Sequence, residues 1–206
     1  MLFIQNGWSI PVEITKKGSK TMKGISLWEP WASLIACGAK RYETRSWPTN
    51  YRGPLLICAS KGGLLKSKLI DVIEELAYQG GLAPLIGKPL DATGENTHCR
   101  SITHKHLQFG KAVAICRLTD CKETGHMSQD EIGIDMPFGD FASGRFAWKL
   151  DDVCRLECSP SFTGRQGLFN VPLDVSRTRQ FVSVLRHNTC QKELTQQWID
   201  ELLGEL

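Results

Sequence analysis

Three charged side chains lie within six residues of one another: Lys40, Glu43 and Arg45. Lysine and arginine both pair with phosphate, arginine through two parallel hydrogen bonds. A carboxylate repels phosphate, so Glu43 is better suited to accept from an exocyclic amine, as acids do from cytosine N4, or to orient the two cations. These residue types predict one polar pocket that binds a nucleotide or nucleic acid. The structural alternative is a simple Glu43–Arg45 salt bridge.

Aromatic side chains flank the charged triplet on both sides. Flat rings stack on an unstacked base, which is worth about 1–3 kcal/mol per base in single-strand binders. Trp31 falls on a helical apolar stripe and is expected in the core, whereas Trp47 and Tyr51 lie in a Pro/Gly loop and are predicted to stack on the base. Trp28 is the fourth flanking aromatic residue. The predicted basic rim of the cleft consists of Arg52, Lys61 and Arg165.

The order of local elements explains why these side chains are expected to converge. Pro30 suits the first position of a short helix, and Gly38 suits its left-handed end. The following run, residues 40–47, has strand character, and strand alternation directs Glu43, Arg45 and Trp47 to one face. Lys40 stands at the corner between helix and strand. We therefore expect a single concave site.

The wider pattern predicts an α+β domain built on a small β-barrel with peripheral helices. Short strands are predicted at 22–27, 54–60, 111–121, 145–158 and 166–171, and amphipathic helices at 64–79 and near 189–203. The predicted organisation is an N-terminal extension (1–21), one domain (22–171) with a helix and loop insertion at about 62–110, and a C-terminal extension (172–206) that carries a helix. The long loop at 80–107 is interpreted as a lid or binding loop.

Composition narrows the function classes. The 206 residues suit one domain, and the net charge is only +3, but residues 1–61 hold nine Lys/Arg and three acids, which suits an anionic partner. The sequence shows neither a membrane span nor a secretory signal, so a cytoplasmic protein without membrane association is expected. Nucleotide-binding glycine loops and the common hydrolase motifs are missing from the sequence.

The chain has eight cysteines, which are expected to be reduced because nothing in the sequence is secretory. Cys37, Cys58 and Cys116 stand in apolar contexts, where cysteine behaves as a small hydrophobe. We predict no cofactor and no metal. The alternative that the spacings leave open is a zinc site, drawn from Cys116, Cys121, Cys154 and Cys158 with Cys99, His104 and His106 nearby.

Residues 38–45 read G-x-K-x-x-E-x-R, which resembles the signature of the ASCH family. The preceding SLWEPWASLI, the following WPTNYRGPLLICASK, and the later GRFAWKL and GRQGLFNV resemble bacterial and phage members. The resemblance implies a β-barrel similar to PUA domains, with a cleft that binds RNA or nucleotides. Some small bacterial members are amidohydrolases that remove acetyl from N4-acetylcytidine, and one described member is a ribonuclease. Their catalytic lysine matches Lys40, but they carry threonine where this chain has Glu43.

Three functions follow from these observations. The first is binding of RNA, DNA or a modified nucleoside through Lys40, Glu43 and Arg45. The second is hydrolysis of an N4-acylated cytidine, with Lys40 as a base whose pKa is lowered by burial and Glu43 as a proton shuttle. The third is a protein-interaction adaptor whose basic face recruits an acidic partner.

Overall fold

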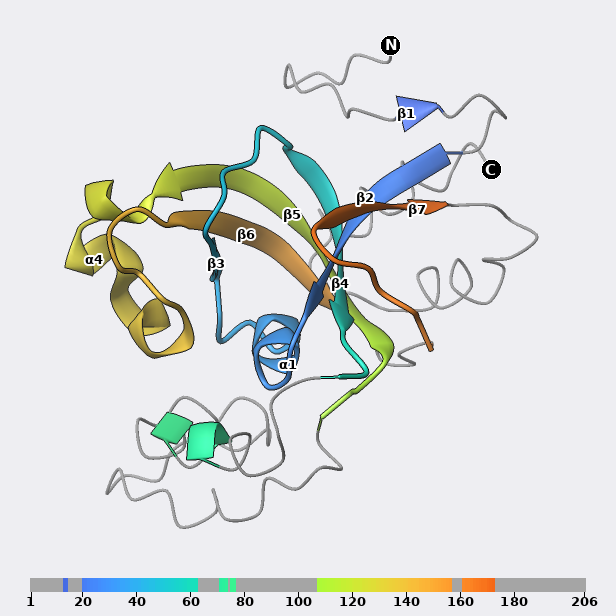
Figure 1. Cartoon of the computed structure of the whole chain (residues 1–206), viewed down its shortest axis with the longest axis horizontal. Helices are drawn as coiled ribbons and strands as arrows, with labels where there is room; N and C mark the ends of the chain where they lie inside the picture. Colours follow the sequence, from blue (N-terminus) through green and yellow to red (C-terminus); the bar gives the residue numbers. More distant parts are fainter. Residues whose placement is uncertain are drawn as a thin grey trace.

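The computed structural model of the chain describes residues 13–14, 20–62, 71–73, 75–76, 107–156 and 161–172. One curved sheet dominates these residues (Figure 1). Its strands are β1 (Glu13–Ile14), β2 (Lys20–Leu27), β3 (Tyr42–Arg45), β4 (Gly53–Ala59), β5 (Lys111–Glu123), β6 (Phe146–Arg155) and β7 (Leu168–Pro172); the helices are α1 (Trp31–Ala36), α4 (Gln129–Ile132) and the 3₁₀ segments η3 (Thr124–His126) and η4 (Gly133–Phe138).

The sheet is mixed. Its strand order is β1-β2-β4-β5-β6-β3, and β7 pairs with β2. The β2–β4 pair is parallel and the other pairs are antiparallel. The α+β class is therefore confirmed. Within the described residues the pairings form an open path from β1 to β3, so the predicted closed barrel is not shown.

Most of the hydrophobic core lies between α1 and one face of the sheet. Ala32, Ile35 and Ala36 of α1 pack with buried side chains from β2, β4, β5 and β6. The parallel β2–β4 pair makes this arrangement necessary, because a parallel neighbour requires a crossover connection and α1 lies in that connection. The crossover also carries β3, which pairs with β6 at the far end of the sheet. Glu43 and Arg45 thus lie on a short edge strand next to the core, and Lys40 lies two residues before it.

Several local predictions are confirmed. Helix α1 begins directly after Pro30, and Gly38, with φ of +79°, follows its end. The described residues of the predicted 64–79 helix are helical at 71–73 and 75–76, and Leu76 is buried there. The strand at 40–47 is shorter than predicted, because β3 ends at Arg45.

Other predictions cannot be followed in the structure. Most of the predicted 80–107 loop and the C-terminal helix near 189–203 lie outside the described residues. The short helical segments between Thr124 and Phe138 had no counterpart in the sequence prediction, and the end of the last one, Pro137 and Phe138 of η4, forms part of one wall of the site.

Gly24 of β2 leaves room for side chains of the neighbouring strand β7. A Cβ at this position would lie 2.8 Å from the Phe169 ring and 2.9 Å from Val171, both buried on β7. We predict that Gly24→Ala lowers the free energy of unfolding by about 1–3 kcal/mol, because a packed ring must move. Chemical denaturation measures the change. Gly62→Ala is the control, since nothing lies within 4 Å of its Cβ; an equal loss in both variants would contradict the prediction.

Candidate functional site

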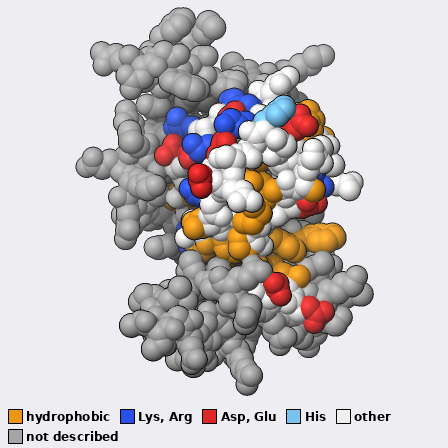
Figure 2. Space-filling model, turned by 90° about the vertical axis from the view of Figure 1, so that its left-hand side faces the viewer, with side chains coloured by type: hydrophobic (Ala, Val, Ile, Leu, Met, Phe, Trp, Pro, Cys, Tyr) orange, Lys and Arg blue, Asp and Glu red, His pale blue; other side chains and the backbone are white. Residues whose placement is uncertain are grey.

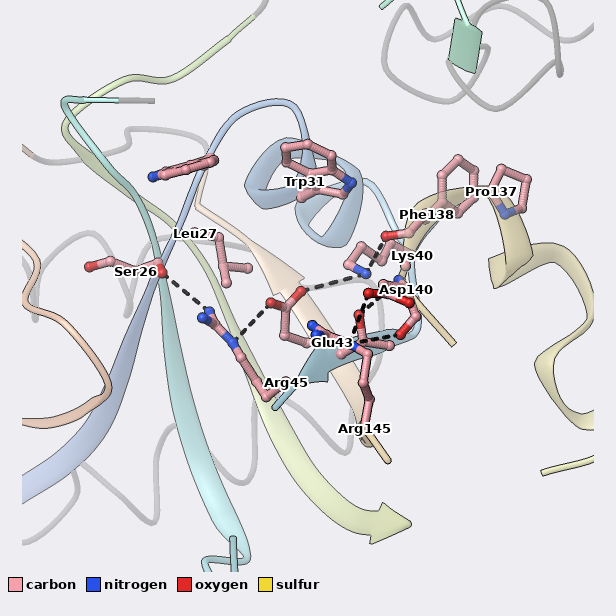
Figure 3. Close-up of a pocket in the computed structure, with 13 residues that line it drawn as sticks. Ser26, Leu27, Trp31, Lys40, Glu43, Arg45, Pro137, Phe138, Asp140 and Arg145 are labelled. Atoms are coloured by element: carbon pink, nitrogen blue, oxygen red, sulfur yellow. Dashed lines mark hydrogen bonds and ion pairs between the residues drawn. The ribbon is translucent and has the colours of Figure 1, made fainter. Parts of the chain in front are cut away.

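A pocket of about 490 Å³ opens beside β3 (Figure 3). Its walls come from four places: the end of β2, the start of α1, β3 itself, and the end of η4 with the turn that follows it. Lys40, Glu43 and Arg45 all line it, so the structure brings the predicted triplet together in one concave site. The volume lies in the range of small-molecule sites.

Lys40 is the most deeply buried charge of the pocket, with only 1% of its surface exposed. Its Nζ donates a hydrogen bond to the carbonyl oxygen of Phe138 at 2.6 Å and lies 3.5 Å from Glu43 Oε2. Its backbone NH donates to the Leu34 carbonyl oxygen at 3.1 Å, which ties the residue to the end of α1. Lys40 therefore joins the helix, the edge strand and the turn after η4.

Glu43 lies between two cations. Its Oε1 is 3.1 Å from Arg45 Nε, while Oε2 is the atom nearest Lys40. Arg45 in turn donates from a terminal nitrogen to the Ser26 carbonyl oxygen at 3.4 Å. This oxygen lies beyond the end of the β2–β7 pairing, which stops at Ile25. The triplet thus connects β3 to β2 across the pocket (Figure 3).

Burial dominates the electrostatics of Lys40. It lowers the pKa of the ammonium group, because the charged form loses its hydration, while Glu43 and Asp135 act in the opposite direction. Arg45 adds a smaller effect that also lowers the pKa. A lysine amine with a lowered pKa next to a carboxylate has the chemistry of a proton donor or acceptor, as well as that of a group that binds a polar ligand.

Asp135, which is fully buried, fixes the wall that faces Lys40. Its carboxylate accepts hydrogen bonds from the backbone NH groups of Arg41 and Tyr42 and from Arg41 Nε at 2.8 Å. Further along the wall, Thr44 Oγ1 accepts from the backbone NH of Asp140 at 3.0 Å. The sequence analysis missed Asp135 because its partners lie more than 90 residues away, and no local pattern marks such a pair.

The aromatic walls come from Trp28 and Trp31 rather than from the two predicted residues. Trp28 is 54% exposed, and Trp31 is half-buried. Trp47 instead packs edge-on against the buried Trp148, with ring centroids 4.6 Å apart, and the Tyr51 hydroxyl donates to the Pro54 carbonyl oxygen. Because β3 ends at Arg45, strand alternation does not carry Trp47 to the pocket.

A buried carboxylate holds the segment that carries both pocket tryptophans. Glu29 is 1% exposed, and it accepts hydrogen bonds from Ser33 N at 3.1 Å, Ser33 Oγ at 2.8 Å and Gln108 N at 2.8 Å. Burial raises the pKa of this carboxyl group, and the three hydrogen bonds oppose the rise. Glu29 therefore fixes the start of α1 against the segment just before β5.

A comparison of the sequence with models of protein families identifies the family of this chain. A model of the ASCH domain matches residues 25–157, well over half of the chain. The chain belongs to the ASCH family. This family is part of the PUA-like superfamily and is generally associated with nucleic acids. A search of curated proteins finds no match to the chain.

The ASCH pocket has a different basic rim from the predicted one. Arg52, Lys61 and Arg165 do not line it. Arg52 donates to the carbonyl oxygens of Thr49 and Tyr51 and pairs with Asp120, so it stabilises its own loop, whereas Lys61 and Arg165 are exposed elsewhere. The rim cation that the sequence analysis missed is Arg145, whose Nε lies 3.3 Å from an Asp140 carboxylate oxygen.

Much of the remaining charge of the ASCH domain is paired. Figure 2 shows basic and acidic side chains next to one another beside a belt of hydrophobic side chains. The exposed or partly exposed pairs in the described residues include Arg117–Asp152, Lys122–Glu131 and Lys149–Asp151. Exposed pairs of this kind leave little net field for phosphate. Among the described residues the pocket, rather than an extended basic face, is thus the strongest candidate for recognition.

Five cysteines of the ASCH chain lie in the described residues, and all are free. Cys58, Cys116 and Cys154 are buried, and Cys37 and Cys121 are partly exposed. Burial raises the pKa of the Cys58 thiol to about 12, so this thiol is protonated and unreactive near neutral pH. Cys99, Cys158, His104 and His106 of the alternative zinc set lie outside the described residues, within which no cluster of metal-binding side chains is found.

The described part of the chain also holds no helix with the length and apolar composition that crossing a bilayer requires.

The charge state of Lys40 gives a direct test of this geometry. We predict that its amine titrates below the ordinary lysine value of about 10.4 and that Glu43→Gln lowers the midpoint further, because the carboxylate favours the ammonium form. Side-chain NMR during a pH titration measures both, with Lys40→Arg to assign the signal. Lys122 is an internal control, since Glu131 raises its pKa. An ordinary Lys40 midpoint would contradict the burial.

The anchoring role of Asp135 is testable by a shape-preserving change. We expect Asp135→Asn to lower the free energy of unfolding by about 2 kcal/mol, because hydrogen bonds to a charged acceptor become bonds to a neutral one. Thermal and chemical denaturation provide the measurement. The matched control is Asp130→Asn, an exposed position on α4. A loss no larger than that of the control would show that Asp135 does not hold the wall.

Proposed function

We propose that this pocket binds one nucleotide of a nucleic acid, or a free or modified nucleoside, with the base inside. The observation that carries the proposal is Glu43, a carboxylate held between Lys40 and Arg45 in the pocket. An anionic group entering alone would meet Glu43 and be repelled. A base edge offers donors and acceptors together, and it can use the carboxylate and the neighbouring cations at the same time.

The tryptophans support a flat ligand. Trp28 lines the pocket and exposes 54% of its surface, so one side of its ring is open to a partner. Tryptophan is enriched at binding interfaces, because its large flat ring offers apolar contact while its N–H keeps a polar partner. A stacked base would cover Trp28, while Trp31 lines the same pocket.

The mouth of the pocket suits the sugar-phosphate part of such a ligand. Arg145 lies there, paired with Asp140, which is 59% exposed. An exposed ion pair is weak, about 0–1 kcal/mol, so a phosphate can replace the aspartate at little cost. In this proposal Glu43 and Arg45 contact the base, Lys40 holds Glu43 in place or contacts the base, and Arg145 meets the phosphate.

The test is a binding panel of nucleosides, nucleotides and short single strands of RNA and DNA, scored by calorimetry. For the tightest binder of the panel, we expect Trp28→Ala to weaken binding about 5- to 150-fold, the loss of one base stack. Arg145→Ala should weaken phosphate-bearing ligands only and reduce the salt dependence. Arg52→Ala is the matched control, because this arginine stabilises a loop outside the pocket. If no panel member binds, or if Arg52→Ala and Arg145→Ala have equal effects, the proposal fails.

Hydrolysis is a second candidate, favoured by one observation: the lowered pKa of Lys40 beside Glu43. A neutral amine can take a proton from water as that water attacks the carbonyl carbon of an N4-acyl group; the amide C–N bond then breaks and the proton passes to the departing amine. Incubation with N4-acetylcytidine and product analysis tests this. Catalysis predicts that Lys40→Ala abolishes turnover but leaves affinity within a few-fold, whereas simple binding predicts no turnover in either protein.

A further inference from the structure

A small hydrophobic cluster includes residues whose backbone contacts Lys40. Its fully packed members are Leu34, Ala39, Leu76 and Phe138, none more than 8% exposed. The carbonyl oxygen of Leu34 accepts from the backbone NH groups of Ala39 and Lys40 at 3.0 and 3.1 Å. The carbonyl oxygen of Phe138 accepts from Lys40 Nζ. Three members are thus next to Lys40 in the chain or bonded to it.

The fourth member comes from the insertion between β4 and β5. Leu76 is 3% exposed, and the neighbouring Val72 and Ile73 also pack against the cluster. Two side chains of this cluster, Trp31 and Phe138, line the pocket as well. The described residues of the insertion therefore back the wall against which Lys40 is bound.

We propose that Leu76 is a positioning residue for Lys40: through Phe138 it keeps the carbonyl oxygen within reach of the ammonium group and keeps water away from it. The insertion then contributes to the structure of the pocket through Leu76. The relevance to ligand binding rests on the function proposed above, but the positioning itself needs no ligand.

The physical reason is the balance of effects on Lys40. Its charged form is disfavoured by burial and favoured by Glu43 and Asp135, with Arg45 acting against it. Shortening Leu76 changes none of these charged groups. It opens space in the cluster that contains Phe138, which lets the wall relax and admits water to the ammonium group. The titration of Lys40 therefore reports on the packing of a side chain that carries no charge.

The experiment compares Leu76→Ala with Leu56→Ala. Leu56 is fully buried in β4 but belongs to neither the pocket lining nor the small cluster. The two changes therefore remove the same side-chain atoms from two buried positions. We expect Leu76→Ala to move the Lys40 titration midpoint, measured by side-chain NMR, upward by about one pH unit. Leu56→Ala should leave it unchanged although it also lowers stability. Leu76→Met, which conserves volume, should restore the wild-type midpoint.

Equal midpoints in wild type and Leu76→Ala would overturn the proposal, and so would an equal shift in Leu56→Ala. If Leu76→Ala does not fold, Leu76→Val removes a single methylene and is measured in the same way, with a smaller shift in the same direction expected. No nucleotide is added in these titrations. A negative binding panel therefore leaves this inference standing, and an unchanged midpoint leaves the proposed function standing.

Discussion

The burial of one ammonium group is the constraint around which this site is built. Removing a lysine charge from water costs several kcal/mol unless acceptors and an opposite charge replace the hydration shell. Here the replacement comes from one near and one distant position in the sequence: the Glu43 carboxylate, three residues on, and the backbone carbonyl of Phe138. The carbonyl can serve only if η4 lies against β3, and Asp135 holds it there. One polar requirement thus fixes the relative positions of helix, edge strand and wall.

The sheet topology explains why the pocket forms at this place. The parallel β2–β4 pair sends the chain through α1 and β3 before it returns, so the crossover brings Lys40 and Glu43 over the end of β2. The β2–β7 pairing ends at Ile25, and the next residue, Ser26, offers its carbonyl oxygen to Arg45. The end of β2, which pairs with β4 but no longer with β7, therefore faces the side chains of β3 across the pocket.

Local chemistry could be predicted from the sequence where the partners are close in the chain. The end of α1 at Gly38 and the convergence of Lys40, Glu43 and Arg45 follow from spacing and backbone preference. The prediction that Trp47 lies in the pocket was wrong, because nothing local in the sequence shows that β3 ends at Arg45. Asp135, Arg145 and Phe138 were not found, since they reach the site only through pairings with residues about a hundred positions away. Long-range hydrogen bonds to backbone atoms leave no periodic signal in a sequence.

The pairing of the first long strand with the last has a consequence for how the chain folds as it is synthesised. Thr21 lies opposite Pro172, so one edge of β2 stays without its β7 partner until about 150 further residues have left the ribosome. Contacts of such large sequence separation are formed slowly, because a long loop must close first. An open strand edge during that interval is a template for pairing with other chains. Nascent-chain association should therefore be most pronounced for truncated chains that stop just before β7.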